Sequence, residues 1–166
     1  MFIHEMFQQK PCVFSVEVFP PKKAGAAEET LYPVLRELCT LGPDYISVTY
    51  GAGGGTAGQS TAKIASYIKN GLHVEALAHL TCVNSTRVQV EETLTRLRED
   101  NVENVLALRG DINPDLPRRM DFLHASDLAK AIAQTGGFGV AGACYPEGHV
   151  ESPSLKADVE SLRYKA

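Results

Sequence analysis

A single carboxylate stands out in the first apolar segment of the 166-residue chain. Glu17 lies near the end of the run 13–19, on the same strand face as Ser15, while Val16 and Val18 share the other face. Parallel strands are usually apolar on both faces, so the pattern predicts that Glu17 is buried near the carboxyl end of a strand. Burial of this kind raises a carboxyl pKa and suits the group to general acid catalysis. A structural ion pair with an Arg or Lys inside the sheet is the alternative.

A cation, a glycine and an anion follow a second apolar run. Arg109, Gly110 and Asp111 come directly after 105–108, and the Asn, Asp and Pro residues of 113–117 predict a loop beyond them. In parallel α/β folds, ligands bind at the carboxyl ends of strands. This position therefore indicates a ligand-binding strand end, with a structural salt bridge as the alternative.

Glycines dominate residues 51–58, between an apolar run and a helical pattern. Gly53, Gly55 and Gly58 match the GxGxxG spacing of dinucleotide-binding loops, and Glu75 follows at about the 20-residue distance of a ribose-binding acid. In that fingerprint the acid ends a strand, whereas Glu75 begins one. The other interpretation is a flexible strand-to-helix loop that allows a flat ligand to approach the backbone.

Two histidines and two cysteines near predicted strand ends could bind a metal ion. They are His79, Cys82, Cys144 and His149. Their spacing matches no ligand signature, and His79 and Cys82 point to opposite faces if one strand continues through both. Packing or hydrogen bonding is the alternative role for all four.

Five strand-like segments alternate with helical patterns and must position these residues. The strand starts recur about every 30 residues, which is the size of a βα unit. Strict alternation predicts an α/β fold with a parallel sheet and right-handed crossovers. A doubly wound sheet and a (β/α)8 barrel both satisfy the pattern, but the barrel needs eight units and about 250 residues. The predicted strands are 13–19, 45–49, 75–81, 104–108 and 139–143.

The helical patterns carry apolar faces and stop or start signals. The predicted helices are 31–41, ending at Gly42; 64–68, ending at Asn70 and Gly71; 90–97, with Asn84, Ser85 or Thr86 as the N-cap; 126–135, ending at Gly136; and one from about residue 153 that is still running at residue 166.

Composition excludes several classes of partner. The net charge is −4 with no basic stripe, which argues against a nucleic-acid partner. No apolar run approaches the roughly 20 residues needed to span a bilayer. Residues 1–10 lack the apolar stretch of a signal peptide, and the four cysteines form no CxxC pair, which favours reduced thiols. We therefore expect a cytoplasmic protein without a membrane partner.

Taken in order, six segments resemble the catalytic domain of flavin-dependent methylenetetrahydrofolate reductases. They are 14–21, 47–52, 79–82, 107–111, 125–128 and 145–149. The resemblance implies a TIM (β/α)8 barrel, of which this chain supplies about the first five βα units, with FAD at the carboxyl ends of the strands. It also implies that NADH or NADPH reduces the flavin, which passes a hydride to 5,10-methylenetetrahydrofolate to form 5-methyltetrahydrofolate.

The resemblance assigns roles to individual residues. Glu17 is implied to be the general acid that opens the bridging ring of the folate. Asp111 is implied to lie near the flavin and the pterin, where its charge stabilises a cationic folate intermediate. Thr49 falls where the family contacts the nicotinamide nucleotide. His124 stands where a Tyr is common. The remaining FAD-binding positions are Tyr50, Ala52, His79, Arg109, Gly110, Asp111, Tyr145, His149, Asp158 and Lys165.

The resemblance also sets an expectation for the domain. The family barrel continues with a sixth strand and two further units, so residues 1–166 are interpreted as the N-terminal part of a single barrel domain. A homo-oligomer is implied for the complete protein. A partner protein that supplies electrons, a metal-dependent barrel hydrolase and a non-catalytic fragment remain as alternatives.

Overall fold

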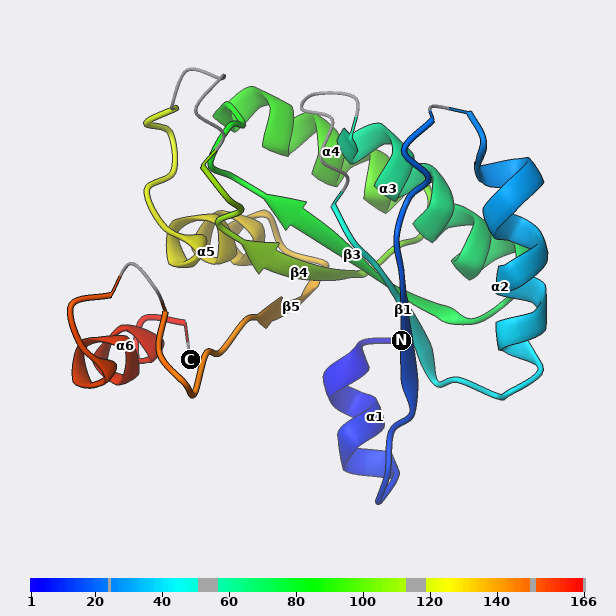
Figure 1. The fold of residues 1–166 in the computed structure, drawn as a ribbon, viewed down its shortest axis with the longest axis horizontal. Coiled ribbons are helices and arrows are strands. Elements are labelled where there is room, and N and C mark those ends of the chain that lie inside the picture. The colour runs from blue at the N-terminus through cyan, green and yellow to red at the C-terminus, as the bar shows by residue number, and fades with distance from the viewer. Residues whose placement is uncertain (24, 51–56, 113–118, 150–151, 166) are drawn as a thin grey trace.

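One parallel sheet forms the centre of the molecule. The computed structural model describes residues 1–23, 25–50, 57–112, 119–149 and 152–165. Its strands are β1 (Ser15–Val18), β2 (Tyr45–Val48), β3 (Glu75–Thr81), β4 (Asn104–Leu108) and β5 (Gly139–Gly142). They are all parallel, and their spatial order is their chain order. A doubly wound sheet reverses its order at a switch point, whereas a barrel wall does not. The predicted α/β fold with five barrel-type units is confirmed (Figure 1).

A helix follows each strand in the chain, at or near the segments where the apolar periodicity predicts one, although the helix expected at 64–68 already begins at residue 57. The helices are α2 (Tyr32–Cys39), α3 (Ala57–Ser66), α4 (Arg87–Glu99), α5 (Ala125–Thr135) and α6 (Leu155–Leu162), with single π-helical turns η1 (Ala27–Leu31) and η3 (Tyr67–Gly71). Thr86 is the N-cap of α4, because its Oγ1 accepts from the Gln89 backbone N–H at 3.2 Å and its own N–H donates to the Gln89 side chain at 2.8 Å.

The last helix is shorter than predicted. Helix α6 ends at Leu162, and the N–H groups of Arg163 and Tyr164 donate to the carbonyl oxygens three residues earlier, Glu160 and Ser161. Tightening of this kind is a common way to satisfy the free carbonyl groups of a helix end. Within the part of the chain that the structure describes, no helix is long and apolar enough to cross a membrane.

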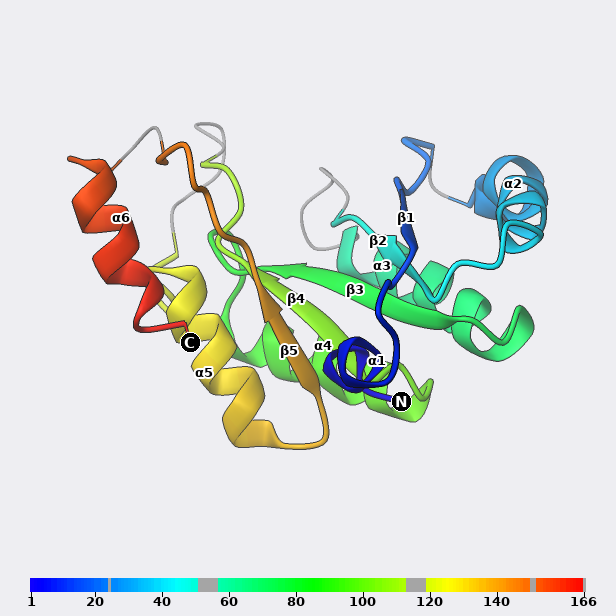
Figure 2. The ribbon, with the colours of Figure 1, turned by 90° about the horizontal axis from the view of Figure 1, so that it is seen from below.

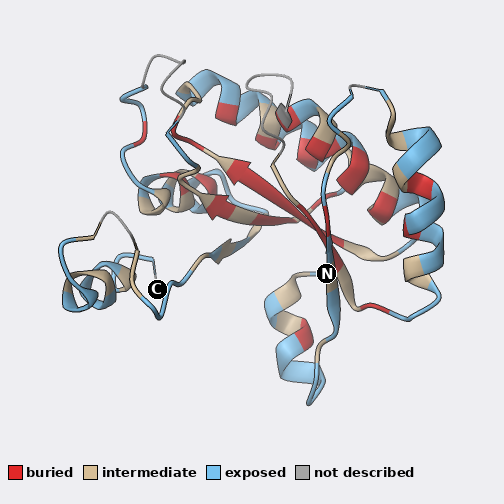
Figure 3. Ribbon diagram, viewed as in Figure 1, coloured by how far each residue is buried: buried red, intermediate tan, exposed pale blue. Residues whose placement is uncertain are grey.

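Among the described residues, α2, α3, α4 and α5 cover one face of the sheet, which we call the outer face. The outer-face side chains of β2, β3 and β4 are buried and form one cluster with Leu35 of α2, Ile64 of α3, Leu94 of α4 and Leu128 of α5. Burial of each such side chain contributes about 1.5–3 kcal/mol. Figure 2 shows the covering helices, and Figure 3 shows that most of β3 and β4 is buried. The buried strand residues of the outer face are Val18, Ile46, Val48, Ala76, Ala78, Leu80, Val105 and Ala107. At the two edges of the sheet, Val16 of β1 is partly buried and Val140 of β5 is exposed.

A short helix that the sequence pattern does not predict, α1 (Ile3–Gln9), lies at the amino ends of the strands (Figure 1). The Ile3 N–H donates to Asn104 Oδ1 at 2.9 Å, and Asn104 Nδ2 donates to the Met1 carbonyl oxygen at 3.1 Å. Gly139 leaves room for Phe2, because a Cβ there would lie 3.2 Å from the Phe2 ring. Helix α1 therefore closes the end of the sheet opposite the candidate site.

Candidate functional site

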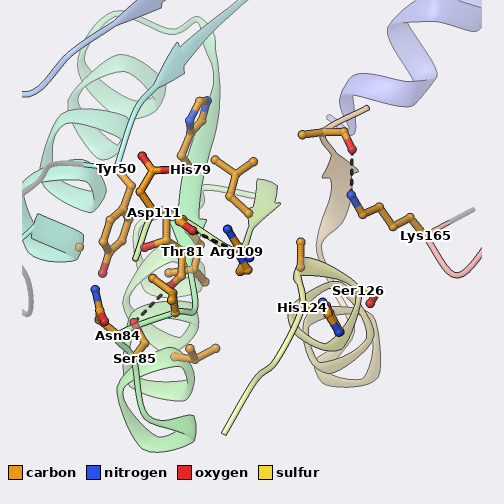
Figure 4. A pocket seen from close by; sticks show the side chains of 18 of the residues that line it. Tyr50, His79, Thr81, Asn84, Ser85, Arg109, Asp111, His124, Ser126 and Lys165 are labelled. Carbon is orange, nitrogen blue, oxygen red and sulfur yellow. Dashed lines mark hydrogen bonds between the residues drawn. The ribbon is translucent and has the colours of Figure 1, made fainter. Parts of the chain in front are cut away.

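A cavity of about 1540 Å³ lies at the carboxyl ends of the strands. It runs from β2 and β3, past β4, to the chain after β5 and to α6. Its lining includes most of the residues that the sequence analysis singles out: Thr49, Tyr50, His79, Arg109, Gly110, Asp111, His124, Tyr145, His149, Asp158 and Lys165. Figure 4 labels Tyr50, His79, Arg109, Asp111, His124 and Lys165 among them. Ala52 lies outside the described residues, as do Gly53 and Gly55.

Three polar side chains meet on the inner face, the side of the sheet opposite the helices. Ser47 Oγ donates to Glu17 Oε2 at 3.1 Å and lies 2.7 Å from His79 Nε2. His79 Nε2 is 3.4 Å from the same Glu17 oxygen. Burial lowers the pKa of His79, and the Glu17 carboxylate opposes this shift. At neutral pH, His79 is therefore a neutral hydrogen-bonding group.

The burial predicted for Glu17 is wrong. Its side chain is 48% exposed, because β1 is an edge strand of the described sheet and pairs only with β2. Ser47 and His79, on the inner strands β2 and β3, are buried on the same face. The desolvation that was expected to prepare Glu17 as an acid is therefore absent from this structure. Glu17 is not among the residues that line the cavity, and its Oε2 lies 3.4 Å from Nε2 of the lining residue His79.

The conformation of the chain after β4 is fixed by two backbone hydrogen bonds and by a glycine with a positive φ. The Arg109 carbonyl oxygen accepts from the N–H groups of Cys82 and Val83, at 3.1 and 2.8 Å. Gly110 has a φ of +84°, and a Cβ there would lie 3.0 Å from the Cβ of Thr81. A larger residue at position 110 would therefore clash with Thr81, which explains the glycine at this position. The next residue, Asp111, is exposed.

The end of β2 is fixed by neighbouring hydrogen bonds. The Thr49 N–H donates to the Val18 carbonyl oxygen at 3.0 Å, and Thr61 Oγ1 donates to the Thr49 carbonyl oxygen at 2.9 Å. Burial raises the pKa of the Tyr50 hydroxyl, and a hydrogen bond with Ser85 opposes the shift. The uncharged phenol therefore presents a flat, partly apolar wall.

The dinucleotide fingerprint does not hold for its described members. Gly58 lies in α3, where a Cβ would be 3.0 Å from the Tyr50 hydroxyl oxygen, so its small size makes room for that ring. Glu75 lies at the amino end of β3 and forms an ion pair with Lys69. Glu75 is in register with Tyr45 at the amino end of β2, whereas the glycine segment follows the carboxyl end of β2 in sequence. Glu75 therefore cannot act as the ribose-binding acid.

The far wall is built from α5, the chain after β5 and α6. His124 is the N-cap of α5, and its N–H donates to Asp127 Oδ2 at 2.9 Å. The rings of Tyr145 and His149 meet edge to face, with centroids 5.2 Å apart. The His149 N–H donates to Asp158 Oδ2 at 2.6 Å.

Lys165 closes this wall by a second contact. Its Nζ donates to the Ala143 carbonyl oxygen at 3.0 Å (Figure 4). Asp158 and Lys165, both expected to bind FAD, therefore also attach the C-terminal residues of the described chain to the segment after β5.

The alternative metal site is not assembled. Across residues 1–23, 25–50, 57–112, 119–149 and 152–165, no group of three or more His, Cys, Asp or Glu side chains is arranged to hold a metal ion. Cys82 is buried, and burial raises its thiol pKa to about 11. It acts as a packing residue, as the alternative interpretation expects.

The chemistry of the cavity fits a large anionic cofactor with a flat ring. Arg109 and Lys165 are cations suited to a pyrophosphate, and Tyr50 and Tyr145 offer aromatic surface. Gly110, which also lines the cavity, has no room for a Cβ between Thr81 and Val83.

Sequence reasoning missed several polar lining residues and the inner-face residue Ser47. The lining residues include Thr81, Ser85 and Ser126. The parallel register that places Ser47 opposite Glu17 could have identified Ser47.

Comparison with known proteins shows to which family the chain belongs. The family described as "Methylenetetrahydrofolate reductase" matches residues 2–166. The chain belongs to this family.

Among methylenetetrahydrofolate reductases, the chain is similar to the 5,10-methylenetetrahydrofolate reductase of Pectobacterium carotovorum, with 37% identity over 151 residues. This match covers 91% of the chain and 49% of the relative. The Escherichia coli protein of the same name is 34% identical, covering 91% of the chain and 50% of the relative. An Arabidopsis thaliana protein named "Methylenetetrahydrofolate reductase (NADH) 1" is 37% identical, covering 89% of the chain and 26% of the relative. The chain thus spans about half the length of the bacterial relatives.

Proposed function

We propose that this chain supplies the Glu17 acid and most of the flavin site of an enzyme that reduces 5,10-methylenetetrahydrofolate to 5-methyltetrahydrofolate, with FAD as cofactor and NADH or NADPH as reductant. The observation that carries the proposal is the arrangement of Glu17 beside His79 at the cavity that Arg109, Gly110 and Asp111 line. The family match over residues 2–166 supports the reaction.

The residues of the cavity have separate tasks in this proposal. Arg109 and Lys165 hold the pyrophosphate, while Tyr50 and Tyr145 contact ring surfaces. Bound FAD supplies hydride transfer between the nicotinamide and the folate. Thr49 and Gly110 also line the cavity, where Thr49 would contact the nicotinamide nucleotide and the Gly110 backbone would face the flavin.

Two carboxylates act on the folate. Glu17 donates a proton to a bridging nitrogen, so that an O–H bond breaks, an N–H bond forms and the imidazolidine ring opens to the iminium ion. Asp111 is exposed at the rim, where its negative charge stabilises the cationic iminium. Both roles are carried from the family resemblance to these two positions.

We propose that the complete enzyme is a closed (β/α)8 barrel and that residues 1–166 are its first five units. In the described structure β1 pairs only with β2, and β5 pairs only with β4. The chain spans about half of its bacterial relatives. The complete protein is further proposed to be a cytoplasmic homo-oligomer on the family resemblance alone.

Anaerobic spectroscopy of the complete protein tests the function. The preparation should be yellow, NADH or NADPH should bleach it, and 5,10-methylenetetrahydrofolate should restore the colour. A colourless preparation that does not bind added FAD would contradict the proposal. Titration of the isolated 166-residue chain with FAD separates a competent half-site from a non-catalytic fragment.

A further inference from the structure

Ser47 is a buried polar residue to which neither the motifs nor the resemblance assigns a role. It lies on β2, between Glu17 on β1 and His79 on β3, and is 6% exposed. Its hydroxyl oxygen contacts both neighbours, at 3.1 Å from Glu17 Oε2 and 2.7 Å from His79 Nε2. Ser47 is therefore the central member of a hydrogen-bonded chain across three strands.

The hydrogen-bond donors among Glu17, Ser47 and His79 can be assigned by counting protons. A serine hydroxyl has one proton, and when Glu17 is the ionised carboxylate, Ser47 donates that proton to Glu17 Oε2. Its contact with His79 then requires Nε2–H as the donor, so the imidazole is in the Nε2–H form and Nδ1 is an acceptor. The burial of His79, which is 8% exposed, favours this neutral form.

The hydrogen bonds among Glu17, Ser47 and His79 restrain the carboxyl group of Glu17, which must lose a proton in the reaction. Half-exposed Glu17 is contacted at Oε2 by both Ser47 and His79, so its carboxyl group is held at one oxygen. Once Glu17 has protonated the folate nitrogen, the remaining carboxylate accepts the Ser47 hydrogen bond. A hydrogen bond to the ionised form stabilises that form.

We propose that Ser47 is a positioning residue for this proton transfer: its hydroxyl orients the Glu17 carboxyl group and fixes His79 in the Nε2–H form. The inference rests on the proposed function, because the proton transfer is part of that function. If Ser47 were only a structural residue, loss of its hydroxyl would affect folding alone. If it is a positioning residue, the loss also affects the reaction with the folate and the tautomer of His79.

The kinetic test compares three variants of the complete protein: Ser47→Ala, Ser47→Thr and Ser66→Ala. Ser66 lies in α3 and accepts a hydrogen bond from Asn70, away from the cavity, so its substitution is a matched control. Ser47→Ala should slow reoxidation of the reduced flavin by methylenetetrahydrofolate by about 10-fold or more. Reduction by NAD(P)H should stay within about two-fold. Ser47→Thr, which keeps the hydroxyl, should recover part of the loss, and Ser66→Ala should match the parent.

A readout independent of turnover is the 15N NMR spectrum of His79. The parent should show the Nε2–H tautomer, and Ser47→Ala should show a mixture of tautomers. The proposal is overturned if Ser47→Ala reoxidises at the parental rate, if both half-reactions fall together, or if the His79 tautomer is unchanged. A parent whose reduced flavin does not react with the folate overturns the proposed function instead, while the NMR result still decides whether Ser47 sets the tautomer.

Discussion

The two faces of the sheet differ in what their residues do. On the outer face, Ile46 and Val48 are fully buried against helices, and such residues hold the fold together. On the inner face, Ser47 lies between them in sequence and joins Glu17 to His79. Because strand residues alternate in direction, one four-residue strand serves both stability and chemistry. The comparison teaches that substitutions at adjacent positions should have separable effects.

The largest effect on stability is expected on the outer face. Ile46→Ala should lower the free energy of unfolding by about 2–5 kcal/mol, because it leaves a cavity in the buried cluster. Ser47→Ala, one residue on, should cost about 1 kcal/mol, the usual worth of a hydrogen bond. Urea unfolding of both variants measures the difference. Equal losses at the two positions would break the distinction between the faces.

A smaller effect is expected at the rim of the cavity. Gly110→Ala places a Cβ at a φ of +84° and 3.0 Å from Thr81, so it should both destabilise the fold by about 1–3 kcal/mol and weaken flavin binding. Gly136, with a φ of +71°, has no atom within 4 Å of an added Cβ. Gly136→Ala should therefore carry the backbone strain without the loss of flavin affinity. Flavin titration of both variants checks this, and equal affinities would show that the rim does not contact the cofactor.

The smallest expected effect is a pH dependence of stability from His79. Burial holds its folded-state pKa below the usual 6.5, so the unfolded chain binds the proton more readily. The contribution is complete above pH 6.5 and is lost as the pH falls below it. His79→Gln should therefore lose less stability than the parent on acidification, as followed by urea unfolding at several pH values. An unchanged slope would show that His79 is not held in its neutral form.

Apolar periodicity predicts the outer face well, because burial against helices selects Val, Ile and Leu at alternating or helical spacing. The same reasoning fails for Glu17. The expectation of burial on both faces holds for an inner strand, whereas β1 is an edge strand of the described sheet and pairs only with β2. Helix α1 was missed because its sequence mixes polar and apolar residues, and its contacts with Asn104 and Gly139 come from distant parts of the chain.

The residues of the candidate site also fall into those that the sequence predicts and those that it does not. Strand-end positions such as Arg109 and Asp111 could be predicted, because the carboxyl ends of parallel strands meet at one edge. Ser47 could not be identified from residue type, since serine is common and its role depends on the register between β1 and β2. The glycine spacing was misleading, because Gly58 makes room for Tyr50 while Glu75 lies at the opposite end of its strand.

The central claim is that Glu17, on the inner face, is the acid for folate reduction and is not needed for reduction of the flavin. Its most direct test is the pair of half-reactions in Glu17→Gln of the complete protein, followed anaerobically by flavin absorbance. We expect reduction by NAD(P)H within about two-fold of the parent and reoxidation by methylenetetrahydrofolate slowed by about 10²–10⁴-fold. Equal loss of both half-reactions, or unchanged reoxidation, would contradict the claim.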